Sequence, residues 1–508
     1  MRILMEMIQV VKGINLKPSD FLSASHPKKS KLNLFYKKII SGDFESDLDA
    51  SEFFFKSDTN NSNYKNLKYS LKERLINSLF FLDAKRFKSD QGKALIYCTK
   101  YLLAGNLLVR LSAKKAGVDL CLKVLKKSLD FELTEFVMLS SRILRSETGS
   151  IKGDIEKFNY YNNLFKTHKT IWEIEVLAEE YYNLLVIPYT KDKSKKIETS
   201  QNAKEYYNEL AGYLQEYDSA YLHLNVRLIQ IIHYEIMGDF DKVLLLSEEA
   251  IQFFSQKKFI YNTPIRIFSH KQLIAFIQLK DYKKGKIAAN KAAENTRIGT
   301  YSWYINQELH LMLALHAKEY QESYLILTSV INHSRFKNVR PRIKERWLLN
   351  KAYIQYLIFI SKVTVEEGDK KQIRMGRFLN SVPIYSKDKQ GLNIPILIIQ
   401  ILFMITKKDY EQSIDRFDAI KKYCSRYLSK DSNPRSNYFI NMLLQIPLAN
   451  FHRSAVLRKA QKYYDKLIST PLEVANQIHE VEIIPYEDLW EFVINSLDMK
   501  IHQIQRYM

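Results

Sequence analysis

The fold is decided by the stretch between residues 225 and 423, in which one short motif recurs. Its four clear copies are Gly238-Asp239-Phe240, Lys280-Asp281-Tyr282, Lys318-Glu319-Tyr320 and Lys408-Asp409-Tyr410. Each copy follows one apolar segment and precedes another. The aromatic residues lie 42, 38 and 90 residues apart, and the last interval has room for two units, divided by a degraded copy at Gly368-Asp369. This recurrence predicts an array of stacked helix pairs.

Small or apolar residues recur at fixed distances after each junction aromatic. The third residue after it is Val243, Gly285, Ser323 or Ser413, and the tenth is Ala250, Ala292, Val330 or Ile420. The pattern resembles the tetratricopeptide repeat, a helix pair whose second helix opens with an aromatic residue. The resemblance covers about residues 225–425, and the spacing near 40 residues indicates longer helices or turns than the usual 34. It implies a binding scaffold.

The composition favours an all-α fold. The 508 residues include only 14 Gly and 11 Pro, too few for the turns of a many-stranded protein. Cys98, Cys121 and Cys424 are scattered, which argues against a disulfide scaffold and predicts a reducing, cytoplasmic location. The most apolar run, 394–405, is shorter than the roughly 20 residues that cross a membrane. We therefore expect neither a transmembrane segment nor a signal peptide.

The chain divides into regions of different regularity. We expect a poorly ordered N-terminus over 1–32, a small three-helix module over 33–90, irregular helical hairpins over 91–189, the tetratricopeptide-like array over 201–428, and C-terminal helices over 429–508 that cap the array. Pro188 is expected to end a helix. The charged segment after it, 190–200, is expected to form an exposed linker.

Basic residues are concentrated in one part of the chain. The net charge is +21, and residues 251–450 hold 33 Lys and Arg against 15 Asp and Glu. The densest cluster falls where one repeat passes to the next and consists of Arg335, Lys337, Arg340, Arg342, Lys344 and Arg346. Such a cluster can bind nucleic acid or another polyanion, or it can keep a large array soluble.

The sequence shows no constellation typical of catalysis. It contains neither a phosphate-binding Gly-rich loop nor a His-Glu-x-x-His zinc motif. Glu308, His310 and His316 lie close together on one presumed helix, and we expect them to have structural roles. The sequence thus predicts a protein that is not an enzyme and that needs neither cofactor nor metal.

The sharpest prediction concerns a groove. In tetratricopeptide repeats the first helix of each pair lines the concave side, at positions counted back from the junction aromatic. These positions here include Leu228, Ile232, Ile274, Ile277, Met312, Leu315, Ile398 and Leu402. A hollow this apolar must be covered, either by other helices of the chain or by an amphipathic partner helix.

We accordingly expect an interaction scaffold that binds a protein or peptide segment. The alternative is a nucleic-acid- or polyanion-binding protein that uses the basic region 251–450. The oligomeric state does not follow from the sequence.

Overall fold

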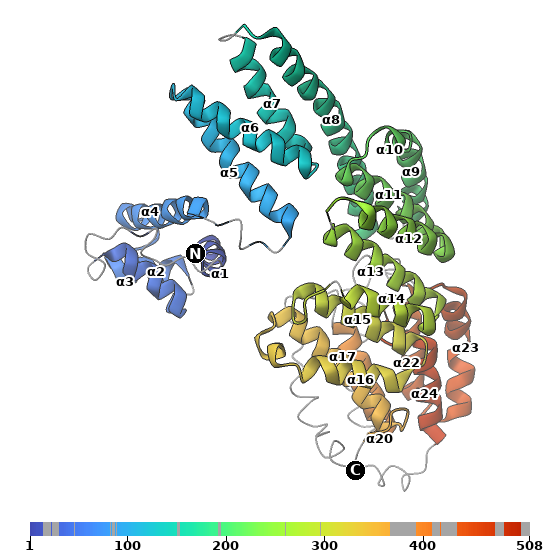
Figure 1. Ribbon diagram of the computed structural model, residues 1–508. Coiled ribbons are helices and arrows are strands. Elements are labelled where there is room, and N and C mark those ends of the chain that lie inside the picture. The colour runs from blue at the N-terminus through green and yellow to red at the C-terminus, as the bar shows by residue number, and fades with distance from the viewer. Residues whose placement is uncertain are drawn as a thin grey trace. The chain divides into compact units, whose positions relative to one another are not determined.

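The computed structural model describes most of the chain. The described residues are 1–13, 22, 30–44, 46–81, 83, 87, 89–149, 153–191, 195–259, 261–294, 296–365, 393–408, 417, 434–472 and 482–498. All regular elements within these ranges are helices, packed largely as neighbouring pairs, so the expected all-α class is confirmed (Figure 1). The chain forms two compact units, Met1–Trp172 and Glu173–Met508, called unit 1 and unit 2.

Unit 1 is built from short helices. They are α1 (Arg2–Gly13), α2 (Lys31–Ser41), α3 (Asp47–Phe55), α4 (Ser62–Ser78), η2 (Leu79–Phe81), α5 (Asp90–Arg110), α6 (Lys114–Asp130), α7 (Thr134–Glu147) and the first part of α8 (Ile155–Lys191). One apolar core joins α1 to α4, and another joins α6, α7 and α8.

The N-terminus begins with a helix that packs on the small module. Residues 2–13 form α1, and Leu4, Ile8 and Val11 are buried among α2 and α4. These three residues recur every three or four positions, so α1 has a single apolar face that the small module can cover. The ammonium group of Met1 also pairs with Asp47 at 2.7 Å. The three-helix module therefore has a fourth helix.

A close approach of backbones fixes the pair α5 and α6. A Cβ added to Gly117 would lie 2.7 Å from the carbonyl oxygen of Gly105 and 2.9 Å from the amide nitrogen of Val109. Cys121 packs against the other side of this crossing, where a Cβ on Gly105 would lie 2.9 Å from its Sγ. The two helices can touch at this depth only because both glycines lack a side chain.

Replacing Gly117 by alanine is therefore expected to destabilise unit 1 by about 1–3 kcal/mol, as overpacking does. Alanine's higher helix propensity, worth about 1 kcal/mol, offsets only part of this cost. Hydrogen exchange of the α5 and α6 amides measures the loss. Gly212→Ala is the control, because Gly212 has an ordinary helical φ of −61° and no neighbouring atom within 4 Å. Equal changes in both variants would contradict the tight crossing.

Unit 2 begins within α8, which runs through Pro188 to Lys191. Its other helices are α9 (Lys196–Leu210), α10 (Tyr213–Glu216), α11 (Ala220–Met237), α12 (Phe240–Gln256), α13 (Asn262–Leu279), α14 (Tyr282–Glu294), α15 (Tyr301–His316), α16 (Tyr320–Ile331), η6 (Ser334–Asn338), α17 (Pro341–Phe359), α20 (Asn393–Lys407), α22 (Pro434–Leu448), α23 (Arg453–Ser469) and α24 (Tyr486–Asp498). Pro188 thus does not end its helix, and most of the expected linker 190–200 is helical.

The recurring junctions share one backbone geometry. Gly238, Lys280 and Lys318 all have positive φ, between 55° and 76°. At Lys280, the N–H donates to the carbonyl of Ile277 at 3.3 Å, and the next N–H donates to that of Phe276 at 3.1 Å. This pair of bonds is the Schellman motif, which ends a helix and turns the chain.

A further junction of the same kind occurs at Ser361. Its φ is 59°, its N–H donates to Ile358, and the N–H of Lys362 donates to Leu357. The degraded copy expected at Gly368-Asp369 lies outside the described residues, as do Asp409 and Tyr410. The long interval in the sequence pattern therefore contains a junction at Ser361.

The second helices bury equivalent positions. Val243, Gly285 and Ser323, three residues after the junction aromatic, are all buried. The residues ten positions after it, Ala250, Ala292 and Val330, are buried too. Positions seven apart lie on the same face of a helix, so each second helix packs by this face.

Candidate interaction site

The eight predicted groove residues are covered by protein. They lie on α11 (Leu228, Ile232), α13 (Ile274, Ile277), α15 (Met312, Leu315) and α20 (Ile398, Leu402); Ile274 is partly buried and the others are buried. The six on α13, α15 and α20 join one large apolar cluster. Leu228 packs in a separate cluster with α12 and α13, and Ile232 packs with α8 and α9.

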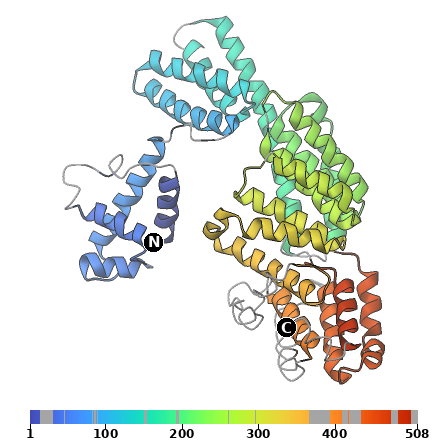
Figure 2. The same cartoon turned by 60° about the horizontal axis from the view of Figure 1, so that its bottom comes forward.

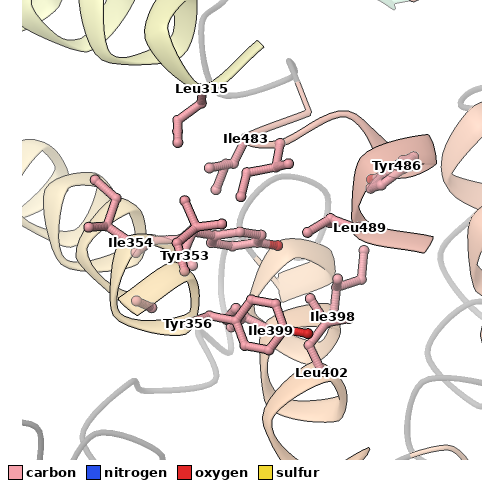
Figure 3. Packing of buried hydrophobic residues seen from close by; sticks show 14 of the residues in the cluster. Leu315, Tyr353, Ile354, Tyr356, Ile398, Ile399, Leu402, Ile483, Tyr486 and Leu489 are labelled. Carbon is pink, nitrogen blue, oxygen red and sulfur yellow. The ribbon is translucent and has the colours of Figure 1, made fainter. Parts of the chain in front are cut away.

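Helices from the end of the chain cover the larger part of the predicted hollow. Figure 3 shows Ile483 and Leu489 gathered with Leu315, Ile398 and Leu402 around the ring of Tyr353. The three last helices, α22 to α24, pack side by side against this cluster and appear in red in Figure 2. Residues 482–498 thus cover Leu315, Ile398 and Leu402 among the predicted groove positions.

Arg435 on α22 holds this closing segment in place. Its Nε donates to Glu482 Oε1 at 2.5 Å, and one terminal nitrogen donates to Glu482 and to Glu487. The other terminal nitrogen donates to the carbonyls of Leu467 and Thr470. Burial opposes the charge of Arg435, but Glu482 and Glu487 outweigh burial and raise the pKa of Arg435. The guanidinium thus stays charged and joins α22, α23 and the start of α24.

Two further cations hold the first turn of α24 against neighbouring hairpins. Lys318 Nζ lies 2.9 Å from Asp488, and Lys280 Nζ lies 3.5 Å from Glu487. Both lysines stand at junctions between helices. The acidic first turn of α24 is also favoured by the positive end of its own helix dipole.

The predicted basic cluster divides into residues with different roles. Arg346 pairs with Glu308 at 2.5 Å, and both side chains are largely buried. Arg335 is exposed, but its guanidinium donates to the carbonyl of Ile298 at 2.8 Å and fixes a loop. Lys337, Arg340 and Lys344 are exposed to solvent. The side chain of Arg342 lies outside the described residues.

The contact of Arg335 brings a second loop beside this cluster. Arg297, Ile298 and Tyr301 are exposed in and after the connection from α14 to α15. The connection from α16 to α17 meets it, because Trp303 and His333 have ring centroids 5.6 Å apart. Arg297, Ile298 and Tyr301 were missed in the sequence because they are distant in the chain from Arg335. The sequence signal that could have found them is that the α14–α15 and α16–α17 connections both join consecutive hairpins, which places these connections next to each other.

These residues define a surface that we call the basic edge. It consists of Arg297, Ile298, Tyr301, Arg335, Lys337, Arg340 and Lys344. Within the described ranges no ion pair joins any of its cations to a carboxylate. Arg340 also precedes α17, whose first turn has no acidic residue. The positive pole of that helix adds to the potential of the edge.

Glu308, His310 and His316 on α15 each contact another residue of the protein. Glu308 pairs with Arg346, although burial raises the pKa of Glu308 to about 7. His310 stacks on Tyr282, and His316 contacts the carbonyl of Glu482 through Nε2. No group of three His, Cys, Asp or Glu residues suited to a metal occurs in the described part of the chain. These contacts account for only part of the polar groups, since His310 Nε2 and His316 Nδ1 are buried without a hydrogen-bond partner among the described residues.

Among the described residues no helix is both long and apolar enough to cross a membrane. No family model matches the chain, and neither curated proteins nor solved structures gave a match.

Proposed function

We propose that the protein is a non-catalytic interaction scaffold that binds an acidic segment of a partner protein along the basic edge. The carrying observation is that the basic edge combines exposed cations, which have no carboxylate partner among the described residues, with the exposed apolar side chains of Ile298 and Tyr301. Cations attract an acidic segment and raise its rate of encounter. Ile298 and Tyr301 can contact hydrophobic side chains of the acidic segment. A surface with cations alone could not make such contacts.

The arrangement of hairpins supports this proposal. We propose that the repeated junctions build a tetratricopeptide-like array. The connections between successive helix pairs, at the opposite end of the helices from these junctions, then form the basic edge. Six of the eight predicted groove residues lie in the large apolar cluster, which supports a binding site elsewhere on the protein. The thiols of Cys98 and Cys121 are unpaired, which supports a reducing compartment such as the cytoplasm.

The test compares two matched triple variants. Replacing Lys337, Arg340 and Lys344 by alanine is expected to weaken binding of a fluorescent peptide of Glu and Leu residues about tenfold, at about 0.5 kcal/mol per exposed charge pair. Fluorescence anisotropy at low salt measures the affinity. The control replaces Arg458, Lys462 and Lys466, which are exposed on α23 and have the same total charge. Equal losses in both variants would show that only net charge matters.

Tyr301 favours a second candidate function, the binding of single-stranded nucleic acid. An exposed aromatic ring beside Arg297 and Arg335 is a platform on which a base can stack while the cations bind phosphates. The same titration with an oligouridine strand separates the two functions. If the strand binds more tightly than the peptide and Tyr301→Ala weakens only the strand, the nucleic-acid function replaces the first.

A further inference from the structure

The second helices of three consecutive hairpins expose one large aliphatic residue at the same position. Leu245 on α12, Ile287 on α14 and Leu325 on α16 each lie five residues after the junction aromatic, and they are 50%, 70% and 52% exposed. The same helices bury their third, seventh and tenth positions. The exposed residues therefore stand on the faces opposite the packing faces and form a ridge.

The charges that flank this ridge have opposite signs on α12 and α14. Leu245 has Asp241 four residues before it and Glu249 four residues after it, and both are exposed. Ile287 has Lys283 and Lys291 at the same two positions, also exposed. On α16 the corresponding residues, Gln321 and Ser329, are uncharged. Residues four apart lie on one helix face, so each aliphatic side chain sits between two like charges.

The helices α12 and α14 are neighbours that run in the same direction. Both pack against α13, and short connections join α13 to each of them, so both are antiparallel to it. Lys291 of α14 lies 3.8 Å from Glu248 of α12, which places the two helices side by side. The acidic and the basic faces thus adjoin, with Leu245 and Ile287 at equivalent heights.

We propose that this ridge is a self-association surface on which a second copy of the chain docks. Consider a two-fold axis that runs parallel to the helices and lies between the two copies, in front of the boundary between α12 and α14. This axis would place α12 of one copy opposite α14 of the other. Asp241 then meets Lys283 of the second copy, Leu245 meets Ile287, and Glu249 meets Lys291. Every contact occurs twice, as in an isologous interface.

The charge pattern selects this occupant and this orientation. A two-fold axis perpendicular to the helices would place α12 on α12, with acidic residues facing acidic residues. A partner with only acidic or only basic side chains would match one helix and be repelled by the other. The ridge is separate from the basic edge, so this inference does not depend on the proposed function.

Sedimentation velocity of the full chain over a range of concentrations and at low salt tests the association. We expect a concentration-dependent dimer that dissociates as salt rises, because exposed charge pairs are screened. Leu245→Ser and Ile287→Ser should each raise the dissociation constant at least tenfold. The matched control is Ile197→Ser on α9, where Ile197 is 76% exposed and outside the ridge. Thermal unfolding checks that the variants remain folded.

A charge exchange tests the pairing itself. Asp241→Lys and Lys283→Asp should each abolish the dimer, because each brings like charges together across the interface. The double variant should restore it to within about threefold of the wild type. A wild-type chain that stays monomeric at low salt would overturn the proposal, even if another protein binds the ridge. So would a dimer that survives both single changes, or one that the double change does not restore.

Discussion

Replacing Arg435 by methionine is expected to lower the free energy of unfolding of unit 2 by about 3–5 kcal/mol at pH 7.5. The change leaves Glu482 buried without its counterion, and an unpaired buried charge is costly. Methionine has a similar length and no charge, so lost packing contributes little. Denaturant unfolding followed by tryptophan fluorescence measures the loss, because Trp303, Trp347 and Trp490 are all buried in the main cluster.

The double variant with Glu482→Gln separates charge from packing. Removing both charges should recover a large part of the loss, since no unpaired ion remains buried. Arg458→Met on α23 is the control, because Arg458 is exposed on a helix that packs beside α22. If Arg435→Met changes the stability no more than this control does, Arg435 does not hold the closing segment.

Unit 2 is also expected to lose stability when the pH falls from 7.5 to 5.5. Burial is the main cause that lowers the pKa of His223, His270, His310 and His316, each to about 4. These histidines are neutral when folded but take up a proton near pH 6.5 when unfolded. Their contribution is therefore complete above pH 6.5 and is lost as the pH falls toward 4.

The expected loss is large because four groups act together. Each histidine contributes about 1.3 kcal/mol between these pH values, for a total of about 5 kcal/mol. Glu308 acts in the opposite direction, because burial raises its pKa to about 7 and it gains stability as the pH falls. Glu308 offsets about 2 kcal/mol, which leaves a net loss of about 3 kcal/mol, and Glu482, whose pKa burial also raises, reduces this loss further.

Denaturant unfolding at several pH values measures how the free energy of unfolding changes with pH. His316→Gln keeps a donor for the carbonyl of Glu482 but cannot titrate, so it should remove about 1 kcal/mol of the pH-dependent loss. His452→Gln is the control, since His452 is exposed. A stability that is constant or that rises on acidification would contradict the neutral state of the buried histidines.

The hairpins could be predicted because their signals are local. Asp239 and Asp281 accept hydrogen bonds from the N–H groups of Lys242 and Lys284, which explains the acidic residue in each junction. The left-handed residue was harder to recognise, since Lys280 and Lys318 occupy a position where glycine is usual.

Other hairpins could not be recognised from the same motif. Ser112 has a φ of 66° and the same two hydrogen bonds as the later junctions, and Gly117 follows at the equivalent small position. Lys114, however, stands where those junctions have an aromatic residue. The region 91–189 therefore looked irregular in sequence although its first hairpin has the same turn.

The closure of the hollow depends on contacts between distant residues. Glu482 and Arg435 are 47 positions apart, and His316 reaches Glu482 across 166. Periodicity shows that an apolar face must be covered but does not identify the segment that covers it. The basic edge likewise depends on the contact between Arg335 and Ile298, which no local pattern indicates.

The tight crossing of α5 and α6 makes Cys121 a chemical reporter of breathing motions in unit 1. Its thiol is buried beneath the two glycines, and burial raises its pKa to about 11. An alkylating reagent reacts with the thiolate, so labelling requires the helices to part. In a Cys98→Ser, Cys424→Ser background, the labelling rate would give the opening equilibrium of this hairpin alone. Trp303, Trp347 and Trp490 lie in unit 2, so with Trp172→Phe added tryptophan fluorescence follows unit 2, and the two units can be monitored separately in one intact chain.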